Sequence, residues 1–192
     1  MRKVTFGGAN SLDNFIARKD DAVDWLMWNK EVTALMKDFW KTIDTVVMGR
    51  RTYEVAMKSF GASSFAYPGV TNYVFSRKLK KTKAPEGINI ISEDAADFVR
   101  KLKKEKGKDI CVMGGGILAR SLFEADLIDE IGFNIQPVLL GSGIPLFHEM
   151  KQINLKLIKC QELKNGCVVL TYRVNHKKAQ KSTRGTKKKN KG

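Results

Sequence analysis

The sequence has few of the residues that build metal sites and disulfide frameworks. Its three cysteines, Cys111, Cys160 and Cys167, and its two histidines, His148 and His176, form no CxxC or Cys/His pattern. An odd number of scattered cysteines argues against a disulfide framework and against a zinc site. We therefore expect a reduced, cytoplasmic protein that holds no metal.

Long apolar runs are missing as well. No stretch approaches the roughly 18 residues of a membrane-spanning helix, and the N-terminal segment MRKVTFGGANS lacks the apolar core of a secretory signal. Hydrophobic residues nevertheless make up 43% of the 192 residues, which is enough to bury a proper core. The length suits a single domain, and the sequence contains no internal repeat.

Acidic residues are absent from the C-terminal end. Residues 175–192 carry eight lysines and arginines and no acid, which leaves 27 basic and 20 acidic residues in the rest of the chain. The net charge of +15 therefore falls to +7 for residues 1–174. Because the tail has no large apolar side chains to bury, we expect residues 1–174 to form the domain and residues 175–192 to be disordered. The tail is either a solubilising segment or a nonspecific contact for nucleic acid, without aromatic residues on which bases could stack.

Strand-like and helix-like segments alternate along the chain as far as residue 128. This alternation predicts an α/β fold with a largely parallel sheet. Asn165-Gly166 is a strong turn signal between two later strand-like runs and predicts a C-terminal antiparallel hairpin, so the sheet should be mixed. Segments 11–26 and 137–147 are expected to be loops. The predicted strands are Arg2–Ala9, Asp44–Met48, Asn72–Ser76, Ile88–Ser92, Asp109–Met113 and Glu130–Gln136, and the predicted helices are Trp28–Trp40, a segment opening at Gly49, Asp94–Lys104 and Ile117–Ala125.

Three glycines, Gly114, Gly115 and Gly116, separate a predicted strand from a predicted helix. The run is either a tight packing turn or an anion site, because glycine lets a phosphate approach the unpaired N–H groups of a helix N-terminus. With Ala119 it formally fits the dinucleotide fingerprint G-x-G-x-x-A. A standard Rossmann unit is excluded, because the run does not follow the first strand and no acid ends the next one. The lack of a GK[ST] sequence excludes a P-loop.

Two other predicted strands end in groups that suit a phosphate. Gly49-Arg50-Arg51-Thr52 follows one buried strand, and Ser76-Arg77 ends another. Ligands of open α/β sheets bind at the carboxyl ends of the strands, so three such ends favour a ligand with several phosphates. NADPH is the natural candidate, because its pyrophosphate suits the glycines and its 2′-phosphate suits an arginine such as Arg51 or Arg77.

The motifs MGRRTYE, YVFSR, KDICVMGGGILARSLFEADLIDEI and PVLLGSGIPLF, in this order, resemble the dihydrofolate reductase superfamily. Within it, the chain is similar to the C-terminal reductase domain of the bacterial bifunctional riboflavin-biosynthesis deaminase-reductase. The resemblance covers residues 2–174. It implies a three-layer α/β/α domain around a mixed, mostly parallel sheet, NADPH as cofactor, and a homodimer. The zinc-deaminase signature H-x-E…P-C-x-x-C is not found in the sequence.

The resemblance also implies roles for particular residues. The segment SLDNFIA matches a family pattern SLDG[FY]IA, with Asn14 at the glycine position. Asparagine tolerates left-handed backbone best among the other residues, so we expect the turn to be kept. The implied cofactor-binding residues are Ala9 beside the nicotinamide, Gly49, Arg50, Arg51 and Thr52 at the phosphates, Ser76 and Arg77 at the 2′-phosphate, and Gly114, Gly115, Gly116, Ile117 and Leu118 at the pyrophosphate and nicotinamide side.

The catalytic and substrate candidates lie near the first predicted helix. Dihydrofolate reductase carries a pterin-binding carboxylate on the helix before the MGR-type strand, and Glu31 lies on the corresponding helix here. Asp13 in SLDN is the second catalytic candidate. Asp24 and Trp25 are the substrate candidates, through charge and ring stacking. Each has a structural alternative, namely a solvated helix face, a turn, a helix cap or core packing.

Together these features predict an NADPH-dependent reductase of the riboflavin-biosynthesis type. Such an enzyme acts like a 5-amino-6-(5-phosphoribosylamino)uracil reductase, by hydride transfer to a ribosylamino-pyrimidine or another small heterocycle. One alternative is a dihydrofolate or pteridine reductase. The alternative from a different class is a nucleotide- or nucleic-acid-binding protein that keeps the fold and uses its basic tail.

Overall fold

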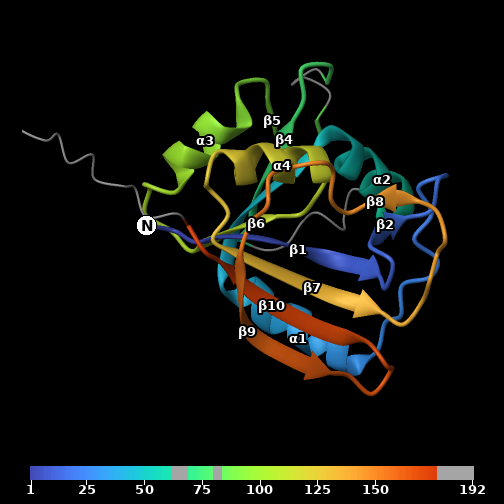
Figure 1. Ribbon diagram of the computed structural model, residues 1–192. Helices are drawn as coiled ribbons and strands as arrows, with labels where there is room; N and C mark the ends of the chain where they lie inside the picture. The colour runs from blue at the N-terminus through green and yellow to red at the C-terminus, as the bar shows by residue number, and fades with distance from the viewer. Residues whose placement is uncertain (62–68, 80–83, 177–192) are drawn as a thin grey trace, which may run out of the picture.

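The computed structural model describes residues 1–61, 69–79 and 84–176. In this part of the chain, strands and helices alternate before a closing strand hairpin (Figure 1). The helices are α1 (Lys30–Lys41), α2 (Arg50–Phe60), α3 (Ala95–Leu102) and α4 (Gly116–Glu124). The strands are β1 (Val4–Ser11), β2 (Phe15–Ala17), β3 (Ile43–Gly49), β4 (Thr71–Phe75), β5 (Ile88–Ile91), β6 (Asp109–Val112), β7 (Glu130–Gln136), β8 (Ile144–Pro145), β9 (Leu155–Glu162) and β10 (Val168–Val174).

Eight of these strands form one mixed sheet in the order β5-β4-β3-β6-β1-β7-β10-β9. The pairs from β5 to β7 are all parallel, and β10 runs antiparallel to both β7 and β9. The β9–β10 hairpin turns at Asn165-Gly166, where Gly166 has φ 80° and the side chain of Asn165 accepts from the Cys167 N–H (3.2 Å). The mixed sheet and its C-terminal hairpin are therefore confirmed.

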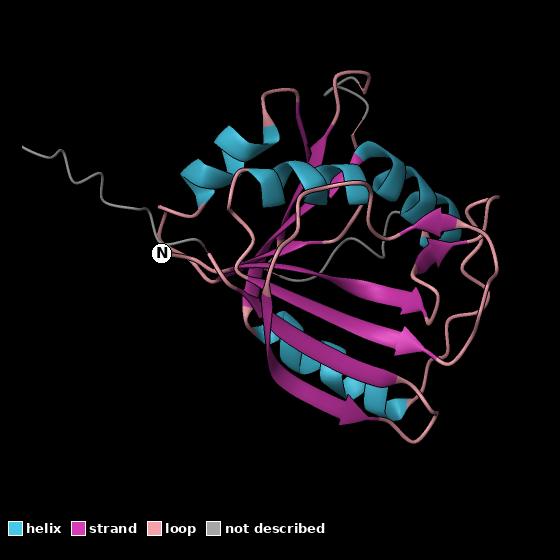
Figure 2. Cartoon of the chain, in the orientation of Figure 1, coloured by secondary structure: helices cyan, strands magenta, loops and turns pink. Residues whose placement is uncertain are grey.

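The four helices cover both faces of the sheet, as Figure 2 shows. Val47 and Val112 point to one face and pack in a core with side chains of α3 and α4. Val46 and Met48, which flank Val47 in the sequence, point to the other face and pack with side chains of α1 and α2. Successive strand residues face opposite sides, which explains why Val46, Val47 and Met48 are apolar without interruption. The three-layer α/β/α arrangement is confirmed.

The structure contains two short strands where we expected loops. β2 pairs antiparallel with β8, Phe15 opposite Pro145, and the Leu146 N–H donates to the carbonyl of Asn14 (2.9 Å). The loop prediction for 11–26 and 137–147 is wrong at these positions, because strands of two or three residues carry no periodic pattern and depend on a distant partner. Asn14 has φ 63°, which is the left-handed backbone expected of it.

Near the carboxyl ends of its central strands, the sheet opens between β1 and β6. β1 pairs with β6 only through Val4, Thr5 and Phe6, whereas its pairing with β7 continues to Ser11. The second half of β1 therefore has a partner strand on one side only. Its other edge presents backbone N–H and C=O groups next to the end of β6, where the glycine run begins.

Several sequence-based expectations concern what the chain lacks. None of the described helices is long and apolar enough to cross a membrane. All three cysteines are free thiols, and the described residues include no group of three or more His, Cys, Asp or Glu side chains placed to hold a metal ion. The predicted disordered tail lies outside the described residues from residue 177 onward.

Candidate active site

The ends of β3 and β6 bring two helix N-termini together. β3 ends at Gly49 and α2 begins at Arg50, while the glycine run leads from β6 into α4 at Gly116. The Gly49 N–H donates to the carbonyl of Gly114 (3.3 Å), and a Cβ placed on Gly49 would lie 3.8 Å from the Gly115 nitrogen. The two motifs identified separately in the sequence are thus in direct contact.

The α2 and α4 N-termini have no side-chain cap, in contrast to those of the other two helices. Asn29 caps α1 by accepting from the Val32 N–H, and Asp94 caps α3 by accepting from the Asp97 N–H. The caps of α2 and α4 are glycines, Gly49 and Gly115, without a side-chain hydrogen bond. Uncapped first-turn N–H groups together with the helix dipole favour an anion.

The glycine run forms a cradle that side chains would fill. The Gly114–Gly115 peptide bond is cis, and Gly114 has φ 92°. A Cβ on Gly114 or Gly115 would lie 3.4 or 3.2 Å from the Thr52 hydroxyl oxygen. A Cβ on Gly116 would meet the Leu146 carbonyl at 2.7 Å, so this glycine allows the segment after β8 to pack against α4.

The first turn of α4 divides its two apolar residues between solvent and core. Ile117 has 74% of its surface exposed although it is a large apolar side chain. Leu118 is buried at 8% exposure and faces Gly49. Ile117 therefore offers an apolar surface next to the cradle, whereas Leu118 supports the cradle from the core side.

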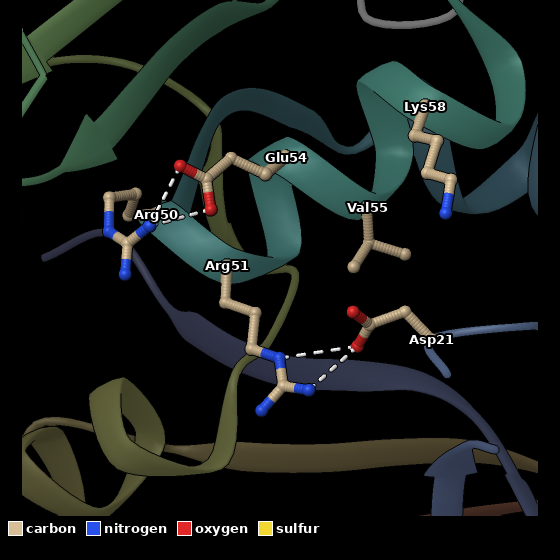
Figure 3. Close-up of a pocket in the computed structure, with 6 residues that line it drawn as sticks. All are labelled: Asp21, Arg50, Arg51, Glu54, Val55 and Lys58. Carbon is tan, nitrogen blue, oxygen red and sulfur yellow. Dashed lines mark hydrogen bonds and ion pairs between the residues drawn. The ribbon is translucent and has the colours of Figure 1, made fainter. Parts of the chain in front are cut away.

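The arginines of α2 line a pocket of about 370 Å³, shown in Figure 3. Arg50 donates to both carboxylate oxygens of Glu54, at 2.8 and 2.7 Å. Arg51 donates through Nε and Nη2 to Asp21, at 3.2 and 2.9 Å. Lys58 also lines this pocket, so three cationic side chains surround it.

Ser76 and Arg77 lie beside this helix N-terminus because of the strand register. Phe75 of β4 pairs with Gly49 of β3, so the two residues that follow Phe75 are adjacent to the start of α2. The Ser76 hydroxyl accepts from the Lys78 and Leu79 N–H groups, at 3.1 and 3.0 Å, and Arg77 is exposed. The three strand ends singled out in the sequence are therefore neighbours in the order β4-β3-β6.

Ala9 lies on the half of β1 that has a partner strand on one side only. It pairs with Asn134 of β7, and Asn134 pairs with Val169 of β10, which packs against side chains of α1. Paired residues share a face of the sheet, so all three side chains lie on the α1 side. The Oδ1 atom of Asn134 is buried and has no hydrogen-bond partner among the described residues.

Sequence reasoning missed Asn134, although the residue stands out as a polar side chain in the apolar strand EIGFNIQ. A buried amide oxygen without a partner costs free energy, of the order of 1–3 kcal/mol, unless a ligand or water supplies a donor. Asn134 is therefore a candidate contact for a polar ligand placed between α1 and the end of β1.

The two catalytic candidates both have structural partners. Asp13 accepts from the Ser11 hydroxyl (2.5 Å) and from the backbone N–H groups of Leu140 (3.1 Å) and Gly141 (2.8 Å). The hydrogen bond from the Ser11 hydroxyl lowers the pKa of Asp13 most, and those from the two backbone N–H groups lower it further. Glu31 accepts from the Lys164 N–H (2.9 Å), which joins α1 to the turn of the closing hairpin.

The two substrate candidates also have structural surroundings of their own. Asp24 pairs with Arg18 at 2.7 Å. The hydrogen bond from Arg18, and to a lesser extent its positive charge, lowers the pKa of Asp24. Trp25 is only 8% exposed. Trp28, which lies three residues further on, is 62% exposed, and nothing in the sequence pattern distinguished the two tryptophans.

Comparison with known proteins agrees with this fold. The molecule has the fold of the dihydrofolate reductases: the Enterococcus faecalis enzyme, solved with NADP(H) and RAB-propyl, superposes with a TM-score of 0.64 at 18% identity, over 91% of this chain and 97% of that one. The model of the RibD C-terminal domain family matches residues 2–169, and the chain belongs to this family. The resemblance noted in the sequence is thereby confirmed.

Two further relatives support the family assignment. The chain is 40% identical to the uncharacterized protein YwjB of Bacillus subtilis strain 168 over 150 residues, which is 78% of this chain and 84% of YwjB. A crystal structure from Shewanella sp. PV-4, named as a candidate riboflavin biosynthesis protein, superposes with a TM-score of 0.73 at 26% identity, over 92% of this chain and all of that one. The chain thus belongs to a family of reductase domains.

Proposed function

We propose that the protein is an NADPH-dependent reductase that transfers a hydride to a ribosylamino-pyrimidine phosphate or a similar small heterocycle. The observation that carries this proposal is the contact between the two uncapped helix N-termini at Gly49 and Gly114–Gly116. Two such N-termini side by side suit a pyrophosphate. The family membership and its riboflavin-related relative favour the pyrimidine substrate.

The residues present fit each part of NADPH. The cradle of Gly114 and Gly115 and the Thr52 hydroxyl would hold the pyrophosphate. Arg50 and Arg51 would neutralise the negative charge of the phosphates near the start of α2. Ser76 and Arg77 would hold the 2′-phosphate. Ile117 and Ala9 would contact the apolar faces of the bases. When bound, NADPH supplies the hydride, and the chain supplies orientation and exclusion of water.

The chain's own residues indicate how the substrate would be held. The amide oxygen of Asn134 would accept a hydrogen bond from the heterocycle, and the exposed ring of Trp28 would stack on it. Asp13 is unsuited to deliver a proton at neutral pH, because its lowered pKa keeps it ionised and three donors surround it. We propose that Asp13 and Glu31 position the segments around the site, each by accepting hydrogen bonds from backbone N–H groups of a neighbouring loop.

The proposal is tested by titrating NADPH and NADH against the full chain, following the quenching of tryptophan fluorescence. NADPH should bind well ahead of NADH, and Arg77→Ala should narrow that gap because it removes one cation near the 2′-phosphate. Turnover is then measured as NADPH oxidation, with the ribosylamino-pyrimidine phosphate and dihydrofolate as rival substrates. Equal affinity for the two cofactors would disprove the arginine assignment, and oxidation with dihydrofolate alone would favour the pteridine reductase.

We also propose that the protein is a homodimer joined through the edge strand β9. Every residue of β9 except Gln161 is exposed, and this strand presents Leu155, Leu157 and Ile158 to solvent. An exposed apolar edge strand is a ready template for pairing with another chain. Leu157→Arg should convert a dimer to a monomer in sedimentation, whereas the neighbouring Lys159→Arg should leave the dimer intact. A monomeric unmodified chain would contradict the proposal.

A further inference from the structure

The pocket on α2 already contains carboxylates at the positions where an anionic ligand would bind. Figure 3 shows the Arg51 guanidinium turned toward Asp21 and the Arg50 guanidinium toward Glu54. Glu54 lies one turn from Arg50 on the same helix, so this pair moves as one body. Asp21 comes from the separate segment between β2 and α1, and its contact with Arg51 joins that segment to the helix.

The turn that carries Asp21 is held by its own hydrogen bonds. The Asp21 N–H donates to the carbonyl of Arg18 (3.1 Å), and the Arg18 N–H donates to the carbonyl of Ala22 (2.9 Å). Arg18 also pairs with Asp24. Asp21 itself has φ 70°, a left-handed conformation that aspartate and asparagine adopt more readily than most residues. Because these bonds form the turn, its fold does not depend on Arg51.

The Asp21–Arg51 ion pair is exposed enough for an anionic ligand to take the place of Asp21. The side chains are 32% and 62% exposed, respectively, and ion pairs in such positions are weak. A phosphate group offers more charge and more acceptor oxygens than one carboxylate. A phosphate that binds Arg51 from the pocket would therefore displace Asp21.

We infer that Asp21 is an affinity-setting residue of the cofactor site, an internal counter-ion that competes with a cofactor phosphate for Arg51. This inference rests on the proposed function, because it takes the ligand to be NADPH. Binding of the phosphate releases the Asp21 segment from α2, so the position of residues 18–24 depends on whether the site is occupied. A weakly charged ligand leaves the pair intact and gains nothing from Arg51.

The test is NADPH affinity of Asp21→Asn, measured by fluorescence titration at low salt. Asparagine keeps the left-handed backbone and the size of the side chain, so the variant should fold. Removing a competing exposed carboxylate should strengthen NADPH binding by about two- to five-fold, the range of an exposed ion pair. The gain should fade at about 1 M salt, where charges are screened within about 3 Å.

Two further variants separate this effect from general charge. Asp97→Asn removes the same charge from an exposed pair on α3, where the partner is Arg100 instead of Arg51, and it should leave NADPH affinity unchanged. In an Arg51→Gln background, Asp21→Asn should have no effect, because the group for which it competes is gone.

The outcomes are distinct. A gain in Asp21→Asn that is absent from Asp97→Asn and from the Arg51→Gln background supports the inference. An equal response of the two aspartate variants, or a gain that persists without Arg51, overturns it while the reductase assignment stands. If the unmodified chain binds no NADPH at all, the proposed function fails and this inference fails with it.

Discussion

The substitution Gly115→Val tests most directly whether the glycine run is a phosphate cradle or a packing turn. Gly115 has φ −87° and ψ 171°, so the change does not require a left-handed φ. Its Cβ would lie 3.2 Å from the Thr52 hydroxyl oxygen, a contact that a small shift of the threonine relieves. The added methyl groups would occupy the space where a pyrophosphate would contact the N–H groups of α4.

The expected loss of affinity follows from the hydrogen bonds that the valine would block. A hydrogen bond to a charged group contributes about 1.5–3 kcal/mol, so loss of one backbone bond to phosphate should weaken NADPH binding by about 10- to 150-fold. Gly115→Ala, with a smaller side chain, should fall between the unmodified chain and the valine variant. The assay is fluorescence titration of all three proteins with NADPH.

Stability serves as the control for this experiment. Replacing a glycine at a compatible backbone position gains about 0.4–1 kcal/mol through the unfolded state, and the tight contact with Thr52 opposes this gain. We expect the melting temperature to change by less than about 4 °C. A folded Gly115→Val protein with unchanged NADPH affinity would refute the hypothesis that the glycine run binds phosphate. The run would then be a packing turn only.

Three other predictions concern the surroundings of the site. Gly116→Ala should destabilise the fold by about 1–3 kcal/mol in urea titration, because its Cβ would meet the Leu146 carbonyl at 2.7 Å; an unchanged midpoint would contradict this packing. A thiol reagent should leave Cys111 and Cys167 unmodified in the native protein and modify all three cysteines after denaturation, because Cys111 and Cys167 are buried and burial raises the pKa of Cys111 to about 12; labelling of either one in the native protein would contradict this burial. The lowered pKa of Asp13 means that its contribution to stability is complete above its unfolded pKa of about 3.9 and is lost as pH falls through the folded value. Asp13→Asn should therefore be less stable than the unmodified chain at pH 7, with a difference that shrinks below about pH 4; a difference independent of pH would exclude the carboxylate as its cause.

The meeting of the strand ends that carry the glycines and arginines was largely predictable from the sequence, because it depends on local patterns. Each phosphate-friendly group follows a buried strand directly, and parallel strands in an α/β sheet end at the same edge. The meeting of Gly49 with Gly114 needed only the order of the strands. The left-handed backbone of Asn14 was predictable for the same reason, since it follows from the turn that the residue occupies.

The surroundings of α1, where we propose that the substrate binds, were much less predictable, because distant partners place their residues. β2 forms only because β8 is beside it, and Glu31 is engaged only because the hairpin turn brings the Lys164 N–H to it. Trp25 and Trp28 differ by three positions, yet one is buried and the other exposed. No periodicity in a segment without regular structure could separate them. The contact of Asp21 with Arg51 likewise joins two segments that share no pattern.

The division of the sheet between β1 and β6 would largely separate the two chemical tasks that we propose for the molecule. Apart from Ala9 and Asp21, the groups proposed for the cofactor follow β3, β4 and β6 or lie on the helices α2 and α4. The groups assigned to the substrate lie on α1, β7 and the segment before α1. We therefore expect substitutions at Asn134 or Trp28 to leave the contacts of Arg50, Arg51 and the glycine run in place, so that substrate preference in such a chain can change while the reducing agent stays the same.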